Sequence, residues 1–392
     1  MIQLQERRTP SPFSLFNLAF RPFFLGGALS AILLMAAWLV IYSGGIQPHH
    51  YNYGVFWHAH EMLFGFSLAI IAGFLMTAVK TWTNVQTLYS WPLAALFLLW
   101  FSARLMPLFP VIEPWLIAVT DLAFAPMVAA CVAWPVIKSR NYRNLMFVPL
   151  LLGFFVANLL MHLQLLGYTE TTASKGIQLG LFLVIMVISI LGGRVIPFFT
   201  ERGVEGVKVT KHAWLEKAII PLTAIWVLLS LTEIKPLIIG ISLLVGFANL
   251  IRVAGWFDKR IFAVPLVWIL QFGYLFVALG FILYSLSLLD LISTSIAYHS
   301  FAAGSIGGLT LGMMARVSLG HTGRPLKVGP LIITAFILML LAAAVRLSVG
   351  LLPLSYLTTL HLSGTLWMLS WVLFLIIYTP ILIKPRLDGL YG

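Results

Sequence analysis

The stretch Trp57-His58-Ala59-His60-Glu61-Met62 places two imidazoles and a carboxylate at the start of a long apolar run. Ionisable groups at the entrance to a bilayer are costly unless they have a partner, so they are candidates for function. Imidazoles are common metal ligands, and a neighbouring carboxylate such as Glu61 can orient a ligand imidazole. Glu61 also has a simpler interpretation, because a negative charge is favoured at a helix N-terminus.

His58 and His60 are two positions apart, which on a regular α-helix directs their side chains about 160° away from each other. One metal ion therefore cannot take both unless the first turn is unwound. Two neighbouring centres could take one each. The alternative is that one histidine is a ligand and the other is a cap or a surface residue.

Most of the other histidines are expected at the same membrane level. Seven of the nine fall on the predicted outer side, and this concentration favours ligation of a shared metal site. The alternative is that they are amphipathic anchors at the membrane interface. The outer set is His49, His50, His58, His60, His162, His299 and His361, whereas His212 and His321 fall on the cytoplasmic side.

Three charged residues lie inside apolar runs, towards their outer halves: Arg104, Asp121 and Arg346. A buried guanidinium requires an anion, and its planar fork binds a carboxylate through two hydrogen bonds. That anion could be Asp121, which would make a structural pair, or a cofactor propionate, which would make a binding site.

The composition excludes a soluble globular domain. Of the 392 residues, 61% are hydrophobic and 9% are charged, and the mean hydropathy is +1.01, which is typical of a polytopic helical membrane protein. The net charge of +12 does not indicate nucleic acid, because the basic residues fall in short loops. The single cysteine, Cys131, excludes a disulfide within the chain and an all-cysteine metal site. No removable signal peptide is expected at the polar, basic N-terminus.

The elements that must position these residues are apolar runs of bilayer-spanning length. They predict an all-α polytopic membrane protein with about twelve transmembrane helices. The predicted spans are 23–43, 60–80, 91–109, 115–137, 145–167, 177–198, 213–231, 235–254, 262–288, 297–318, 328–350 and 356–383.

The distribution of basic residues predicts the orientation. Loops rich in lysine and arginine stay in the cytoplasm, so both termini are expected there. Only Lys175 and Lys235 fall in the opposite loops, which instead contain the acidic residues Glu113, Glu170, Glu233 and Asp290.

A weak internal similarity predicts a repeat. The segments 72–83, 191–200 and 311–322 each end in a basic or polar turn followed by a threonine. Superposing His60 on His299 also superposes Gly65 on Gly304, and Arg104 then falls near Arg346. We therefore expect one transmembrane domain, 1–392, with a cytoplasmic segment 1–20 and three possible four-helix units at about 21–143, 144–260 and 261–386.

Four strings of the sequence are distinctive: Phe20-Arg21-Pro22-Phe23-Phe24, Trp57-His58-Ala59-His60-Glu61-Met62-Leu63-Phe64-Gly65, Gly193-Arg194-Val195-Ile196-Pro197-Phe198-Phe199-Thr200 and Arg316-Val317-Ser318-Leu319-Gly320-His321-Thr322-Gly323-Arg324-Pro325. They resemble the NnrS family, and the resemblance runs from about residue 17 to the C-terminus. The resemblance implies a multi-pass protein of the bacterial inner membrane that binds haem and copper. It also implies a role in the nitric oxide, nitrosative-stress and denitrification response.

With those cofactors expected, the haem is predicted to be b-type and non-covalent, because the chain has no Cys-x-x-Cys-His motif. His60 and His299 are the predicted axial ligands. Arg104 and Arg346 are predicted to neutralise the propionates. Copper is predicted on His58, His162 and His361, with Met62 as a possible soft fourth ligand.

Two function classes remain open. One is a redox enzyme that binds nitric oxide and reduces or otherwise removes it; the other is a non-catalytic sensor or handler of nitric oxide or metal. The absence of a cytochrome c motif and of a row of intramembrane carboxylates weakens the first. A transporter is the third interpretation, which the outer level of the histidines disfavours. No phosphate loop, nucleotide fingerprint or serine-nucleophile motif is present.

Overall fold

The computed structural model describes residues 13–45 and 54–392, and within these ranges it contains helices and no β-strand. Ten helices in this part of the chain are long and apolar enough to cross a membrane, which confirms the prediction of an all-α polytopic membrane protein. The two other predicted spans coincide with the 17-residue helix α8 and with the composite helix Thr294–His321. The span count of twelve and the cytoplasmic termini stay predictions.

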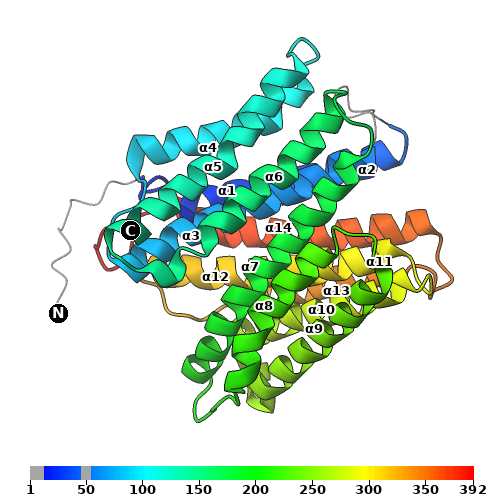
Figure 1. Cartoon of the computed structure of the whole chain (residues 1–392). Helices are drawn as coiled ribbons and strands as arrows, with labels where there is room; N and C mark the ends of the chain where they lie inside the picture. The colour runs from blue at the N-terminus through cyan, green and yellow to red at the C-terminus, as the bar shows by residue number, and fades with distance from the viewer. Residues whose placement is uncertain (1–12, 46–53) are drawn as a thin grey trace. The chain divides into compact units, whose positions relative to one another are not determined.

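The chain groups into two compact units, and their helices are labelled in Figure 1. The first comprises residues up to 180 together with 314–326 and 374–392. Its main helices are α1 (Phe20–Tyr42), the continuous α2–η1–α3 (Gly54–His60, Glu61–Ser67, Leu68–Thr83), α4 (Ser90–Leu105), α5 (Pro114–Lys138) and α6 (Phe147–Leu165).

The second unit comprises residues 181–313 and 327–373. Three helices, α7 (Thr172–Gly203), α12 (Gly308–His321) and α14 (Tyr356–Ile383), contribute residues to both units. The remaining helices of this unit are α8 (Ala213–Leu229), α9 (Lys235–Trp256), α10 (Pro265–Leu288), α11–η5 (Thr294–His299, Ser300–Gly307) and α13 (Pro330–Leu347). The three predicted four-helix repeats are not tested by this grouping and stay a prediction.

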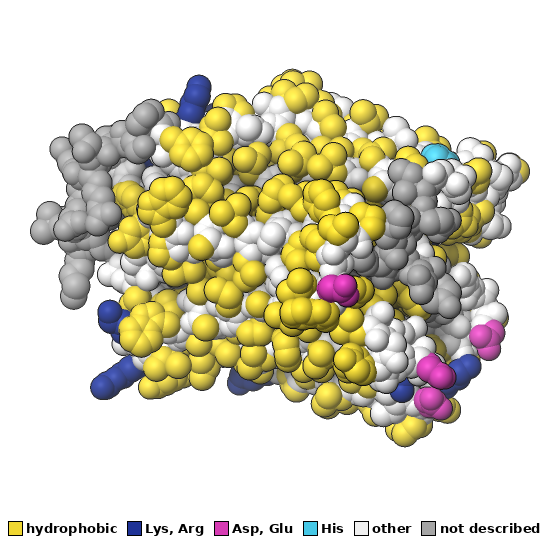
Figure 2. Space-filling model, turned by 90° about the horizontal axis from the view of Figure 1, so that it is seen from above, with side chains coloured by type: hydrophobic (Ala, Val, Ile, Leu, Met, Phe, Trp, Pro, Cys, Tyr) yellow, Lys and Arg dark blue, Asp and Glu magenta, His cyan; other side chains and the backbone are white. Residues whose placement is uncertain are grey.

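Apolar side chains cover much of the outside as well as the inside. Figure 2 shows a face occupied mainly by hydrophobic side chains, with most of the charged groups towards its edges. Large exposed residues such as Leu33, Trp134 and Leu228 would be unfavourable in water but suit a lipid environment.

In the described part of the chain, two π-helical segments interrupt otherwise α-helical spans. Segment η1 begins directly after His60, and segment η5 begins directly after His299. π-helical turns are rare and frequently occur at functional sites. The predicted superposition of His60 on His299 therefore has a local structural counterpart, since each histidine ends an α-helical segment at the start of a π-helical one.

The Phe20-Arg21-Pro22 string ties the start of α1 to the end of the chain. Arg21 is fully buried and donates to the carbonyl oxygens of Leu382, Lys384 and Gly392 at 2.7–2.8 Å. The last carbonyls of a helix such as α14 have no intrahelical partner, and a cation is favoured there. Arg21 thus holds the C-terminal segment against α1.

Candidate metal centre

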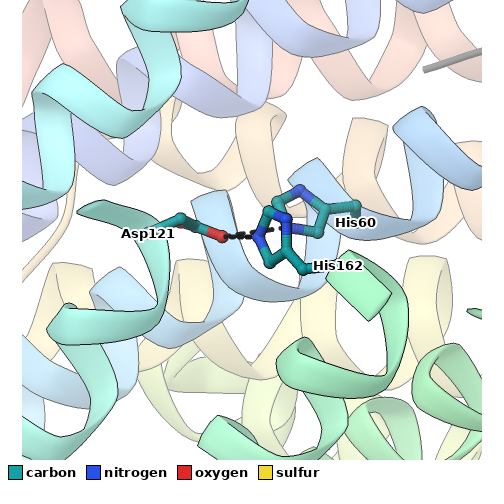
Figure 3. A group of neighbouring side chains, drawn as sticks. All are labelled: His60, Asp121 and His162. Atoms are coloured by element: carbon teal, nitrogen blue, oxygen red, sulfur yellow. Dashed lines mark hydrogen bonds and ion pairs between the residues drawn. The ribbon is translucent and has the colours of Figure 1, made fainter. Parts of the chain in front are cut away.

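Three helices of the first unit bring His60, Asp121 and His162 together (Figure 3). One ligand atom from each residue lies within 4.8 Å of the others, which is close enough for a single metal ion to reach all three. The side chains are 0%, 5% and 3% exposed, so the cluster is enclosed by protein. Two imidazoles and one carboxylate form a donor set that transition metals use.

The cluster is centred on one oxygen atom of Asp121. His60 Nε2 lies 3.0 Å and His162 Nε2 lies 3.1 Å from Asp121 Oδ2. Asn158 Nδ2 donates to the same oxygen at 2.7 Å, while Asn158 Oδ1 lies 2.9 Å from His60 Nε2. Both imidazoles therefore direct a nitrogen towards one point.

A second set of contacts holds these side chains in place. Glu61 Oε1 lies 3.0 Å from His60 Nδ1, and Glu61 Oε2 lies 3.1 Å from Arg104 Nε. Arg104 also forms an ion pair with Asp121 Oδ1. Arg104 thus joins both carboxylates, and Glu61 holds the His60 ring. The first predicted role of Glu61, orienting an imidazole that ligates a metal, stays a prediction.

Local sequence explains how each side chain reaches the cluster. Asn158 and His162 are four residues apart on α6, so they share one face of that helix. In the π-helical segment, Trp100 Nε1 donates to the Gly65 carbonyl at 2.9 Å. A Cβ at Gly65 would lie 2.9 Å from Glu61 Oε2 and 3.1 Å from Arg104 Cδ, so glycine leaves the room that the Glu61–Arg104 pair occupies.

When both histidines are neutral, the charged side chains in and around the cluster do not sum to zero. Glu61 and Asp121 supply two negative charges and Arg104 supplies one positive charge, leaving one negative charge in an apolar setting. Both ring nitrogens of His60 face oxygens that accept hydrogen bonds. A proton on that ring, or one equivalent of metal charge, would neutralise the cluster.

His58 faces a different neighbour from His60, as the spacing predicts. Its ring stacks on Trp38, with the ring centroids 4.6 Å apart and an interplanar angle of 16°. His49 and His50 lie outside the described residues.

Three other predicted site residues, His299, Arg346 and His361, belong to the second unit. His299 Nδ1 donates to the Ser295 carbonyl oxygen at 2.7 Å, which leaves the ring lone pair on Nε2, the atom that could ligate a metal. His361 is half-buried on α14. The pairing of His60 with His299 and the grouping of His361 with His58 and His162 stay predictions.

The prediction of His60 as an axial ligand of a haem stays a prediction, and any metal ion bound to this ring would have to replace a contact that the ring now makes. Both ring nitrogens are already within 3.0 Å of Glu61, Asp121 or Asn158. The sequence left two possible anions for Arg104, a protein carboxylate or a cofactor propionate. The structure shows the carboxylate, because the Arg104 guanidinium forms ion pairs with Asp121 and Glu61.

The central role of Asp121 was not predicted from the sequence, which presented it only as a partner for arginine. Two signals were available: an acid inside an apolar run, and the Asn158/His162 spacing on one helix face. A second buried network was missed altogether. Arg252 on α9 pairs with Glu216 on α8 through two contacts of 3.0 and 2.7 Å, and also donates to Tyr274 on α10.

In a comparison with curated proteins, none matched the chain. The family described as NnrS protein matches residues 14–386 of the 392. That match covers the whole of the His60–Asp121–His162 cluster and both π-helical segments. The chain therefore belongs to the NnrS family, which assigns it in general terms to the membrane proteins of the nitric oxide response.

Proposed function

We propose that the protein binds a copper ion through His60, Asp121 and His162, in the periplasmic half of the bacterial inner membrane. We further propose that nitric oxide is the ligand or substrate of that centre. The observation that carries this proposal is the convergence of three buried ligand atoms within 4.8 Å. Family membership supplies the link to nitric oxide.

The charge of the cluster supports a cuprous ion. One negative charge remains on Glu61, Asp121 and Arg104 taken together, and one monovalent cation balances it. A divalent ion would leave one positive charge, which a bound anion would have to offset. The imidazoles of His60 and His162 suit copper in either oxidation state.

The surrounding side chains would prepare the site for the metal. His60 would release its proton as the ion enters, because a ligand nitrogen must be deprotonated. Glu61 would hold the His60 ring, and Arg104 would keep Asp121 ionised and oriented. Three protein ligands leave a coordination position for a small molecule, which is the chemistry that the ion supplies.

Two classes of function fit such a centre, and the burial of the cluster favours the non-catalytic one. A protein that only binds nitric oxide or metal needs neither an electron path nor a proton path. A redox enzyme needs both. Anaerobic nitric oxide consumption by the purified protein with an artificial electron donor would distinguish the two classes, because only the enzyme would turn over.

The test of the metal site is copper content per protein after purification and reconstitution. Asp121→Asn and His162→Ala should each lower copper affinity about 10–100-fold, as for the loss of other metal-site groups. His212→Ala is the control, because His212 is exposed and lies outside the cluster. Stoichiometric copper in both cluster variants would refute the site.

Two further variants test the alternative ligand set. His58→Ala and His361→Ala should keep copper if Asp121 is a ligand. If these two lose copper while Asp121→Asn keeps it, the metal is held by the histidine set predicted from the sequence. Circular dichroism and size-exclusion profiles of each variant would separate metal loss from misfolding.

A further inference from the structure

Arg346, near the end of α13, is a buried cation for which the described part of the chain supplies no carboxylate. The residue is 5% exposed. Its Nη2 donates to Ser295 Oγ at 3.2 Å and to the Tyr356 hydroxyl at 3.0 Å, and both acceptors are neutral. Its Nε is buried without a hydrogen-bond partner among the described residues.

Three other buried arginines show the contrast, because Arg21 donates to three backbone carbonyl oxygens and the other two pair with carboxylates. Arg104 is joined to Glu61 and Asp121, and Arg252 is joined to both oxygens of Glu216. In both of these pairs the chain itself supplies the anion that a guanidinium in a membrane requires. Among residues 13–45 and 54–392, no carboxylate forms an ion pair with Arg346.

We propose that Arg346, Ser295 and Tyr356 form a binding site for a planar oxyanion, a carboxylate group or an anion of similar shape, supplied by a molecule outside the chain. The guanidinium provides charge and an unused Nε–H donor. A hydroxyl that accepts from a guanidinium still carries its own hydrogen, so Ser295 and Tyr356 can donate to the same anion.

The site is placed where three helix ends meet. Ser295 is in the first turn of α11, Arg346 is in the last turn of α13, and Tyr356 is the first residue of α14. The guanidinium lies against the Tyr356 ring, 5.3 Å from its centroid, and Tyr356 itself is 41% exposed. An anion would reach the buried Arg346 past this exposed tyrosine.

The site is also coupled to His299. Ser295 contributes its hydroxyl to Arg346 and its carbonyl oxygen to His299 Nδ1. An anion that orders Ser295 and Arg346 would therefore also order the imidazole one turn along α11. This proposal is independent of copper at the His60 cluster, which belongs to the other unit.

The first arm of the test uses formate as the probe, with full-length protein in lipid nanodiscs at constant ionic strength set by methanesulfonate. Wild-type protein should gain thermal stability saturably with formate. Arg346→Gln should lose the response, and Ser295→Ala and Tyr356→Phe should each raise the half-saturating concentration about tenfold. Lys175→Gln, which removes an exposed cation, should respond like wild type.

The second arm distinguishes a free small anion from the carboxylate of a retained larger molecule. If wild type shows no formate response, mass spectrometry of its organic extract should find a stoichiometric carboxylic acid that Arg346→Gln lacks. Arg346→Lys keeps the charge and should retain a weaker form of either signal, which separates anion loss from misfolding. A wild-type protein with neither a response nor a retained acid would overturn the proposal, as would a wild-type response in Arg346→Gln.

Discussion

Gly193 lies so close to Arg252 that a Cβ built on the glycine would be 1.7 Å from Nη2 of the guanidinium. The neighbouring Gly192 is also constrained, since a Cβ there would lie 2.5 Å from the Tyr274 ring. These two glycines of α7 leave the space in which Arg252 and Tyr274 meet. The Gly193-Arg194-Val195 string therefore has a packing reason in this network.

Gly193→Ala should destabilise the protein by about 3 kcal/mol, because the added methyl must displace the buried Arg252–Glu216 pair. Gly240→Ala is the matched control: Gly240 lies inside α9, and a Cβ there would meet nothing within 4 Å. That control should stabilise by about 0.5–1 kcal/mol. Unfolding in sodium dodecyl sulfate would measure both, and equal effects would contradict the packing argument.

Arg104→Leu should cost about 3–5 kcal/mol of stability, because it leaves Glu61 and Asp121 buried together without their cation. Adding Asp121→Asn should recover part of the loss, since one of the two charges is then gone. A double-mutant cycle should show coupling of about 1–3 kcal/mol. Additive effects would show that Arg104 does not interact with Asp121 in the folded protein.

Gly65→Ala should weaken copper binding about tenfold without removing any ligand. The added Cβ would press on Glu61 Oε2 and Arg104 Cδ, and these two residues orient His60 and Asp121. Copper titration of the purified variant would measure the change, with Gly240→Ala as the reference. Unchanged affinity would mean that the Glu61–Arg104 pair does not tune the cluster.

Arg21→Ala should release the C-terminal segment. Three charged hydrogen bonds to Leu382, Lys384 and Gly392 would be lost, each worth about 1.5–3 kcal/mol at most. Limited trypsin digestion should then cut sooner after Arg386 than in the wild type. Arg143→Ala, which changes an exposed arginine, should leave the cleavage rate unchanged.

Hydropathy was sufficient to predict the class of fold, because a bilayer imposes long apolar helices whatever their neighbours. Hydropathy was less able to predict the residues at which each helix begins and ends. The span predicted at 60–80 is the helix Gly54–Thr83, since the polar histidines hid its first turns from a hydropathy criterion. Neither π-helical segment was predicted, because no residue pattern in Glu61–Ser67 or Ser300–Gly307 distinguishes π from α geometry.

The candidate site was predictable in its residue types but not in its pairings. His60, His162 and Arg104 were identified from their positions in apolar runs. Their convergence on Asp121 depends on how α5 and α6 pack against η1, and helix packing is set by many weak contacts that a single sequence does not reveal. The Arg252–Glu216 pair was missed for the same reason.

The π-helical segment after His60 makes the site sensitive to how the helix is wound as well as to side-chain chemistry. A π-helical turn accommodates one residue more than an α-helical turn, and each α-helical residue advances the direction by about 100°. Deleting a single residue within Glu61–Ser67 would let the helix relax to regular α geometry with the direction of His60 relative to α3 kept. If every residue were kept and the segment were wound as a regular α-helix, His60 would rotate by roughly that angle relative to α3 and point away from Asp121. The register between the two ends of one helix, and not only the identity of its histidine, thus determines whether the cluster can form.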